Sequence, residues 1–425
     1  MSDSVFVIGG GFAGIAAAFA AREAGAEVVM ACGRGGAASF SPGAIDHVFW
    51  DELEAASELV GAKLVAAPLP TGARALLDAL DLFHVPDDGA PLPRLVTSLG
   101  VVRTTRAFDR ALADLGALRG RRLILPRADR PGWDADSLAR VLRDSPHVAS
   151  VEVVDCPVLR YDEETRVSDA ELAERHDDPA RIEWLSQRLA REVQHRPSVP
   201  CAVLLGPWLG RERARAEDLS ARVGAPVGEV MSAVSGSAGA RFEAARARLL
   251  ARLEVTLVAS EVSLVTRGRE LEVVAGGEAF AVRAVVLATG GLVGGGLVYE
   301  PPEHGGAADG AARVSPPFRL GVKVPGARVA AVADHGVVGS TEGPVLDQRT
   351  WPSGGNQGLL ERAGALVGPA GEISSGIFAA GDVTFGARRT ALAAVASGLA
   401  AGRAAVARLA FERASVSGQQ ARKVS

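Results

Sequence analysis

The chain has 425 residues, enough to bury the core of one large domain or two smaller ones, and a formal net charge of −4. This charge balance, with no long basic run, excludes the electrostatic footprint of a nucleic-acid-binding protein. The three cysteines, Cys32, Cys156 and Cys201, are far apart and odd in number. They exclude a disulfide framework and a CxxC metal or cluster site, and they favour a reducing, cytoplasmic location.

The first thirty residues predict a strand, a helix and a second strand. The first strand is the apolar run at residues 5–8, the helix is the Ala-rich run at residues 15–24, and the second strand lies at residues 27–31. No signal peptide is expected before the first strand. A GxGxxG spacing connects the first strand to the helix, through Gly9, Gly11 and Gly14.

Each of these glycines has a physical role in binding a dinucleotide. Gly9 permits a tight turn, Gly11 lets the backbone approach a pyrophosphate, and Gly14 allows the helix to pack closely on the strand. The start of the helix, at Phe12 and Ala13, offers free N–H groups to the anion. Because the motif follows a strand and opens a helix, it predicts a dinucleotide site rather than a purely structural turn.

The acidic residue that usually binds the adenosine ribose is missing. Its position, about twenty residues after the glycines, falls on Ala31 or Cys32. The contact with the adenosine half is therefore expected to be weaker than the glycines suggest. Cys32 and Gly33 are still candidate cofactor contacts, although a cysteine at a strand end more often packs than reacts.

A loop rich in Gly, Ser and Pro follows at residues 33–46. We expect it to wrap the middle of the cofactor, with Ser39, Ser41 and the backbone of Gly43 as hydrogen-bond donors. The alternative is an ordinary surface loop.

The middle of the chain alternates short strands and helices, which predicts a second α/β layer inserted into the first domain. The strongly charged stretch at residues 161–178 is expected to be a solvated loop. The expected helices lie at residues 51–61, 136–142, 179–193 and 211–223, and the expected strands at residues 95–105, 123–125, 151–154 and 202–205.

The last part of the chain returns to the first domain. A helix is expected at residues 239–253, then short strands at 255–259, 262–266, 271–274 and 280–287, a Gly- and Pro-rich segment at 291–376, a strand meeting a turn at 377–382 and a closing helix at 391–410. The apolar stretch at residues 390–411 contains Arg403, Arg408 and mostly small residues, so we expect it to pack on the sheet and not to span a membrane directly. The predicted organisation is a discontinuous flavin-binding domain (1–60, 237–300 and 370–425), an inserted α/β domain (61–236) and a smaller insertion (301–369).

Three separate segments look like pieces of one flavin site. Residues 9–14, 288–291 and 381–382 each follow a predicted strand, and in a doubly wound sheet ligands bind at the carboxyl ends of the strands. Asp382 can accept a hydrogen bond from a ribityl hydroxyl group, or it is only a turn residue. The candidate cofactor contacts are Gly9, Gly11, Phe12, Ala13, Gly14, Cys32, Gly33, Ser41, Gly43, Val262, Ala288, Thr289, Gly290, Gly381 and Asp382.

An anionic substrate would need a local arginine. Arg103 and Arg388 rank first because each follows or precedes a predicted cofactor segment, and His47 is a weak candidate for proton transfer. No metal site is expected. The further candidates are Arg34, Arg106, Arg349, Arg389 and His335.

Several segments also match the pattern of a known family. They are residues 40–46, which match an F-S-S-G-S-L-D loop, residues 99–104, 204–207 and 239–241, and residues 285–300, where Gly294–Leu297 is the most specific piece. In these segments the chain resembles flavoproteins of the fumarate reductase/succinate dehydrogenase type, and among them the B-type component family of the anaerobic glycerol-3-phosphate dehydrogenase. That family also tends to lack the ribose-binding acid. The chain departs from it at residues 366–369 and 388–392.

The resemblance implies an α/β fold with a Rossmann-like FAD-binding domain and an inserted, cap-like α/β domain. It also implies a cytoplasmic subunit, attached to the membrane through partner subunits, of a complex that oxidises glycerol 3-phosphate. In that complex a catalytic flavoprotein and an iron–sulfur subunit pass electrons to quinone, while the flavin carries the redox chemistry. FAD is favoured because three glycines suit a pyrophosphate, and FMN is the alternative. A stand-alone FAD-dependent oxidoreductase acting on another small anionic substrate, and a flavin-free scaffold subunit, are the other two hypotheses.

Overall fold

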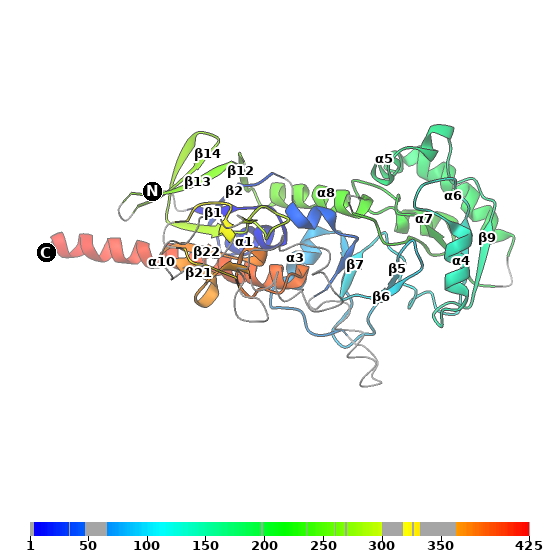
Figure 1. Cartoon of the computed structure of the whole chain (residues 1–425), viewed down its shortest axis with the longest axis horizontal. Helices are drawn as coiled ribbons and strands as arrows, with labels where there is room; N and C mark the ends of the chain where they lie inside the picture. Colours follow the sequence, from blue (N-terminus) through cyan, green and yellow to red (C-terminus); the bar gives the residue numbers. More distant parts are fainter. Residues whose placement is uncertain are drawn as a thin grey trace, which may run out of the picture. The chain divides into compact units, whose positions relative to one another are not determined.

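The fold is given by a computed structural model (Figure 1). It describes residues 4–33, 35–46, 66–196, 199–234, 236–259, 261–267, 270–299, 318–324, 327–331 and 363–424. The chain forms two compact units: unit 1 comprises residues 1–37, 71–73 and 250–425, and unit 2 comprises residues 38–70 and 74–249. The domain boundaries inferred from the sequence stay a prediction. The fold is a mixed α/β one with parallel sheets, as predicted.

Unit 1 is built on a six-stranded sheet whose strand order is β12-β2-β1-β16-β22-β21. The first five strands are parallel, and β21 pairs antiparallel with β22. The central strand β1 is buried along its whole length because its Val and Phe side chains are covered on both faces. The bounds are β1 Ser4–Ile8, β2 Glu27–Ala31, β12 Thr256–Val258, β16 Ala284–Leu287, β21 Glu372–Ser374 and β22 Ile377–Ala379.

The strand order reverses next to β1. From β1 the chain goes to β2 and β12 on one side, and later to β16 and β22 on the other side. In open α/β sheets the crevice at such a switch point, outside the carboxyl ends of the strands, is where ligands bind. The fold therefore marks the carboxyl ends of β1 and β16 as the place to look for a site.

Two helices of unit 1 pack very closely against each other: α1 (Phe12–Glu23) and α10 (Ala391–Val424). A Cβ atom at Gly398 or Gly402 of α10 would collide with the backbone of Ala13 or Ala17 in α1. Among the described residues, Ala391–Glu412 of α10 is long and apolar enough to cross a membrane by length and composition, a test that a core helix also passes. The closing helix is thus confirmed, and it extends to Val424 (Figure 1).

Smaller sheets complete unit 1. The strand expected at residues 280–287 is wrong: Arg283 separates β15, which pairs antiparallel with β14, from β16, which lies parallel to β1. The segment at 291–376, expected to hold connections and a smaller insertion, contains short strands among its described residues. The bounds are β13 Val262–Arg267, β14 Glu270–Ala275, β15 Glu278–Val282, β17 Leu297–Tyr299, β18 Phe318–Leu320, β19 Val329–Ala331, β20 Ala363–Ala365, and the short 3-10 turns η4 Pro369–Gly371 and η5 Gly381–Val383.

Unit 2 is built on a four-stranded parallel sheet in the order β11-β10-β8-β9. Its strands and helices bury a core of Leu, Val, Ile and two Trp side chains. The bounds are β8 Arg122–Pro126, β9 Ser150–Val154, β10 Cys201–Leu205, β11 Val227–Glu229, α4 Ala135–Arg143, α5 Asp169–Arg175, α6 Pro179–Gln194, α7 Ala216–Val223 and α8 Ser237–Arg252.

Unit 2 also contains short strands near its start. The strand expected at residues 95–105 is a hairpin of β5 and β6, because Gly100, with φ of 85°, and the bond from Thr97 N to Val101 O turn the chain back. The helix expected at 51–61 lies outside the described residues. The bounds are η1 Gly36–Phe40, β3 Ala44–Ile45, α3 Ala73–Leu80, β4 Phe83–His84, β5 Arg94–Val96, β6 Val102–Thr104 and β7 Ala107–Asp109.

Two other expectations for unit 2 are wrong. The stretch at 161–178 is not a loop: it forms the 3-10 turn η2 (Asp162–Thr165) and helix α5, which Ser168 and Glu171 begin with a capping box. The helix expected at 211–223 begins only at Ala216. In the first case most of the charged side chains are exposed, as expected, but the chain there is helical and Glu164 is buried against Arg181.

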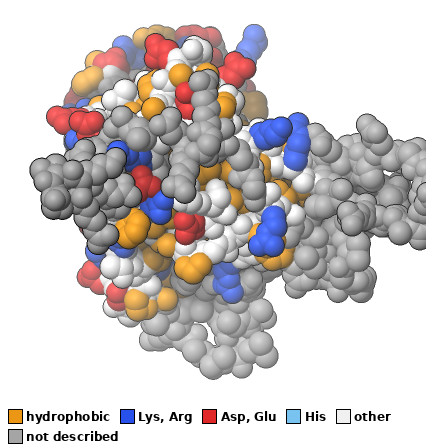
Figure 2. Space-filling model, turned by 90° about the vertical axis from the view of Figure 1, so that its left-hand side faces the viewer, with side chains coloured by type: hydrophobic (Ala, Val, Ile, Leu, Met, Phe, Trp, Pro, Cys, Tyr) orange, Lys and Arg blue, Asp and Glu red, His pale blue; other side chains and the backbone are white. Residues whose placement is uncertain are grey.

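The surface agrees with the small net charge. On the face shown in Figure 2, basic and acidic side chains of the described residues are both present and are separated by uncharged ones.

Candidate functional site

Backbone hydrogen bonds align the carboxyl ends of four strands in unit 1. Gly9 N donates to Ala31 O at 2.9 Å, Ala288 N donates to Ile8 O at 2.7 Å, and Ala380 N donates to Leu287 O at 2.9 Å. The residues that follow β2, β1, β16 and β22 therefore lie in one row. The structure thus brings together the three segments that the sequence predicted as pieces of one site.

Gly9 and Gly14 are required by the packing of this edge. A Cβ atom at Gly9 would collide with the carbonyl group of Ala288, and one at Gly14 would collide with the carbonyl oxygen of Gly9. Gly9 also has a φ of 111°, a conformation that residues with a Cβ rarely adopt. These contacts explain two of the three glycines without any ligand.

Gly11 is different, because its own backbone does not require glycine. Its φ of −76° and ψ of −172° are allowed for any residue, and it caps α1 without a side-chain hydrogen bond. The one heavy atom found near a Cβ at this position would be Gly35 O, at 3.1 Å. The glycine at this position is therefore not explained by backbone conformation, and it precedes the first turn of α1, the part of a helix that suits an anion.

The segment after β16 is a tight glycine turn. Gly290 has a φ of 78°, and Gly296 N donates to Gly291 O at 3.0 Å. A Cβ at Gly296 would collide with Gly290 O and approach the Thr289 hydroxyl group to 2.6 Å. The turn keeps Thr289 at the strand end, which accounts for the glycines in the segment at 294–296.

Asp382 lies in η5, directly after β22. Gly381 N donates to the Ser397 hydroxyl group at 2.9 Å, which fixes η5 on α10. The side chain of Asp382 is half-buried, and this burial raises the pKa of its carboxyl group while the charge of Arg389 opposes the rise. Asp382 is therefore a carboxylate at a strand end beside a guanidinium group.

The arginine that reaches Asp382 is Arg389 and not Arg388. Arg389 donates to Asp382 O at 3.0 Å, whereas the side chain of Arg388 is exposed. From the sequence, Arg388 ranked higher. Adjacent residues on a turn point in different directions, and the sequence does not show which of the two faces Asp382.

The other cofactor candidates are spread over both units. Cys32 and Gly33 follow β2 in unit 1, and Val262 begins β13, half-buried against the core of that unit. In unit 2, Gly43 N donates to the Ser41 hydroxyl group at 3.2 Å, and the Ser39 hydroxyl group donates to Glu243. The loop donors are thus engaged within unit 2, and their contact with a cofactor stays a prediction.

The candidate catalytic residues lie in different units or outside the described residues. Arg103 forms an ion pair with Asp46, and Arg106 is fully buried, donating to Ala67 O, Pro86 O and the Asp88 carboxylate. Both arginines belong to unit 2. The remaining candidates lie outside the described residues: His47, His335, Arg34 and Arg349.

Unit 2 has a switch point of its own, but the chain fills it. The strand order reverses between β8 and β10, and a tryptophan follows each of these strands. Trp133 and Trp208 lie edge to face with ring centres 5.6 Å apart, and the Arg130 guanidinium lies 5.3 Å from the Trp208 ring centre. Both rings are at least 95% buried. This edge is therefore core, which leaves the edge of unit 1 as the candidate ligand site.

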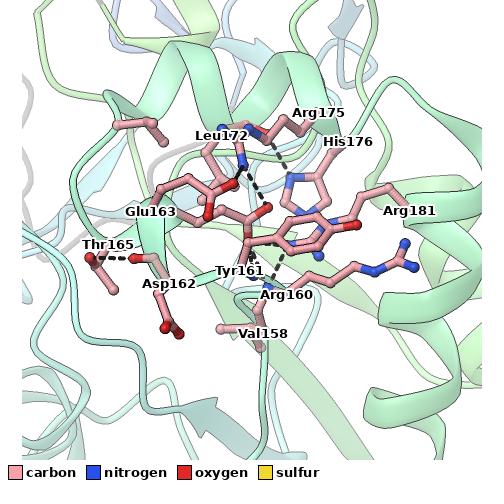
Figure 3. Close-up of polar contacts among 12 residues, drawn as sticks. Val158, Arg160, Tyr161, Asp162, Glu163, Thr165, Leu172, Arg175, His176 and Arg181 are labelled. Atoms are coloured by element: carbon pink, nitrogen blue, oxygen red, sulfur yellow. Dashed lines mark hydrogen bonds and ion pairs between the residues drawn. The ribbon is translucent and has the colours of Figure 1, made fainter.

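A buried polar network stabilises the same part of unit 2 (Figure 3). The Glu164 carboxylate accepts hydrogen bonds from Arg181 at 2.7 Å and Arg175 at 3.2 Å. His176 contacts Leu172 O at 2.9 Å, and burial, followed by the charge of Arg181, lowers the pKa of His176 to about 3. His176 is therefore a neutral core histidine and not a proton shuttle at neutral pH.

A second buried network was missed from the sequence. Arg241 donates to Asp109 at 2.7 Å, to Glu229 at 2.7 Å and to Gly210 O at 2.7 Å, and all three charged side chains are at least 99% buried. One guanidinium group faces two carboxylates, so one negative charge is in excess. Burial raises the pKa of Glu229 to about 7, and Arg241 opposes the rise.

This excess charge predicts a pH dependence of stability. The folded state holds the Glu229 proton more tightly than the unfolded state, whose pKa is near 4.5. We expect the free energy of unfolding of unit 2 to fall as the pH rises from about 4.5 to about 7, and Glu229→Gln to reduce that fall. Urea unfolding of both proteins across this range, followed by Trp fluorescence, measures the difference. Equal pH slopes in the two proteins would contradict the assignment.

No protein-family model and no curated protein sequence matches the chain. Solved structures match it at low identity. Sdh1 of Mycobacterium smegmatis in complex with UQ1 is 13% identical over 100% of this chain and 72% of that chain, with a TM-score of 0.33. The open conformation of a flavocytochrome c3 fumarate reductase is 11% identical over 96% of this chain and 78% of that chain, with a TM-score of 0.33.

Another matched structure is the 3-ketosteroid delta1-dehydrogenase of Sterolibacterium denitrificans, which is 16% identical over 68% of this chain, with a TM-score of 0.23. This chain spans 47% of that enzyme and 59% of the iminodiacetate oxidase of Chelativorans sp. BNC1. The likeness is distant and identifies no specific family. It concerns the fold alone, so the function is argued from the strand-end geometry of unit 1.

Proposed function

We propose that this chain is a flavin-dependent oxidoreductase subunit that binds FAD at the carboxyl edge of β1, β16 and β22. The observation that carries the proposal is the row formed by Gly9, Ala288 and Ala380 at the switch point of unit 1. Gly11 and the start of α1 suit a pyrophosphate, and Asp382 suits a ribityl hydroxyl group. When bound, the flavin supplies the redox chemistry.

The finer proposal rests on the sequence resemblance. It is that the chain acts like the B-type component of anaerobic glycerol-3-phosphate dehydrogenase, in a cytoplasmic complex attached to the membrane through its partners. There glycerol 3-phosphate would lose two electrons and two protons to become dihydroxyacetone phosphate, and an iron–sulfur subunit would pass the electrons to quinone. Activity of the purified chain without partners would instead favour a stand-alone oxidoreductase acting on another small anionic substrate.

One observation favours a second candidate, a flavin-free scaffold subunit. No acidic residue follows β2, where Cys32 stands instead, so the adenosine ribose lacks its usual partner. FMN, which has no adenosine half, would also fit this absence. Titration of the purified chain with FAD and with FMN, monitored by quenching of flavin fluorescence, separates the three possibilities, and chromatography of acid-released flavin identifies any that co-purifies.

Gly11→Ala provides a matched test of the site. Its backbone angles allow alanine, and the added Cβ would lie 3.1 Å from Gly35 O, which must shift by a few tenths of an ångström, so we expect only a small fall in the melting temperature of the flavin-free protein. The added methyl group stands where the pyrophosphate approaches, so we expect FAD affinity to fall by about tenfold or more. Unchanged FAD affinity in a folded Gly11→Ala variant would place the cofactor elsewhere.

A further inference from the structure

Arg389 connects three backbone segments of unit 1. One terminal nitrogen of its guanidinium group donates to Asp382 O in η5 at 3.0 Å, and the other donates to Ala363 O in β20 at 2.9 Å. Strand β20 is itself fixed to the end of η5, because Phe385 N donates to Ala365 O at 2.8 Å. The arginine thus bridges two segments that the chain already places side by side.

The third segment is the glycine turn after β16. A Cβ atom at Gly291 would collide with the Arg389 guanidinium group and would lie 3.2 Å from the Cβ of Asp382. The guanidinium group therefore lies across the backbone of Gly291. A planar, charged group that binds two carbonyl oxygens fixes such a junction more precisely than a lysine would.

Arg389 also acts on Asp382 electrostatically. Burial raises the pKa of the Asp382 carboxyl group, and the Arg389 charge lowers it again. The polar groups that fix the neighbouring Gly381 are the hydroxyl groups of Ser397, from α10, and of Thr384. Of these groups only Arg389 carries a charge, so its removal leaves burial unopposed.

We propose that Arg389 is a positioning residue of the cofactor site: it fixes Asp382 and the Gly291 turn in one arrangement and places a positive charge beside the Asp382 carboxylate, which accepts a hydrogen bond from a flavin hydroxyl group. The proposal rests on the proposed function, because it concerns flavin binding. It assigns Arg389 no contact with substrate. Arg389 acts on the flavin through Asp382. Flavin binding by the purified protein, without substrate or partners, therefore measures the effect of Arg389.

The experiment measures the affinity of the purified full chain for FAD, and separately for FMN, by fluorescence quenching between about pH 5 and 9. Arg389→Met is expected to weaken binding by about tenfold at neutral pH. Its binding should also require a higher pH, because without the neighbouring positive charge the pKa of Asp382 is higher. In the Asp382→Asn background, Arg389→Met should weaken binding without moving its pH midpoint.

Two further variants sharpen the test. Arg403→Met, on an exposed residue of α10, is the matched control and should bind like the wild type at every pH. Arg389→Lys keeps the charge without the two-pronged bridge, so it should keep the wild-type pH midpoint with several-fold weaker binding. If Arg389→Met does not fold, Arg389→Lys tests the proposal instead. Wild-type flavin affinity of Arg389→Lys would overturn the proposal.

The outcomes separate the two proposals. A wild-type chain that binds neither FAD nor FMN overturns the proposed function. A wild-type chain that binds flavin, with Arg389→Met equal to Arg403→Met, overturns the role of Arg389 only. A loss of the same size at every pH also overturns it, since this is what a purely structural bridge would give.

Discussion

Arg241→Met is expected to lower the free energy of unfolding of unit 2 by about 3–5 kcal/mol, among the largest effects of any single substitution in the chain. The side chain is fully buried and donates to two carboxylates and to Gly210 O. Without it, Asp109 and Glu229 are left buried next to each other with no positive charge. Their carboxyl groups must then either remain unpaired or take up protons.

Chemical unfolding followed by Trp fluorescence measures this effect, because Trp133 and Trp208 are buried in the core of the same unit. Arg248→Met is the matched control, since Arg248 lies on the same helix, is exposed and should change stability by less than about 0.5 kcal/mol. Adding Glu229→Gln to Arg241→Met should recover part of the loss by removing one buried charge. Equal stability of the two methionine variants would show that the network is not a stabilising element.

The start of unit 1 was predictable because its signals are local. The strand, the three glycines and the helix lie within the first 31 residues. The GxGxxG spacing by itself indicates a structural role for each glycine. Ala288 and Gly381 could also be placed, because each follows an apolar strand and parallel strands end at one edge. The sequence thereby identified the edge before the strand order was known.

The buried ionic networks were not predictable, because their members are distant in the chain and charge usually indicates solvent. Asp109 and Arg241 are 132 residues apart, and only the folded sheet brings them together. The same argument covers the buried pair of Glu164 and Arg181, since the other charged side chains around Glu164 are mostly exposed. Arg389 was one of several arginine candidates in the sequence. Only the structure shows that, in the turn before α10, the side chain of Arg389 points to Asp382 while that of Arg388 is exposed.

The two ways in which a glycine can be required have different consequences for function. At Gly11 the backbone is ordinary, so under the proposed function a change there should affect binding more than the fold. At Gly9 both the conformation and the space are set by the protein itself, since the Ala288 carbonyl group occupies the position of a side chain. A change at Gly9 should therefore affect the fold before it affects any ligand.

Gly9→Ala is accordingly expected to lower the free energy of unfolding of unit 1 by about 2–5 kcal/mol, from the cost of a positive φ and from collision with the neighbouring strand end. Gly25→Ala separates the two causes: Gly25 also has a positive φ, of 80°, but an added Cβ would meet no heavy atom of the described residues within 4 Å. It should cost only about 1–2 kcal/mol. Hydrogen exchange of β1 and α1 measures both variants in unit 1. If Gly9→Ala were no less stable than Gly25→Ala, the close contact between the ends of β1 and β16 would be wrong, and with it the geometry on which the flavin site rests.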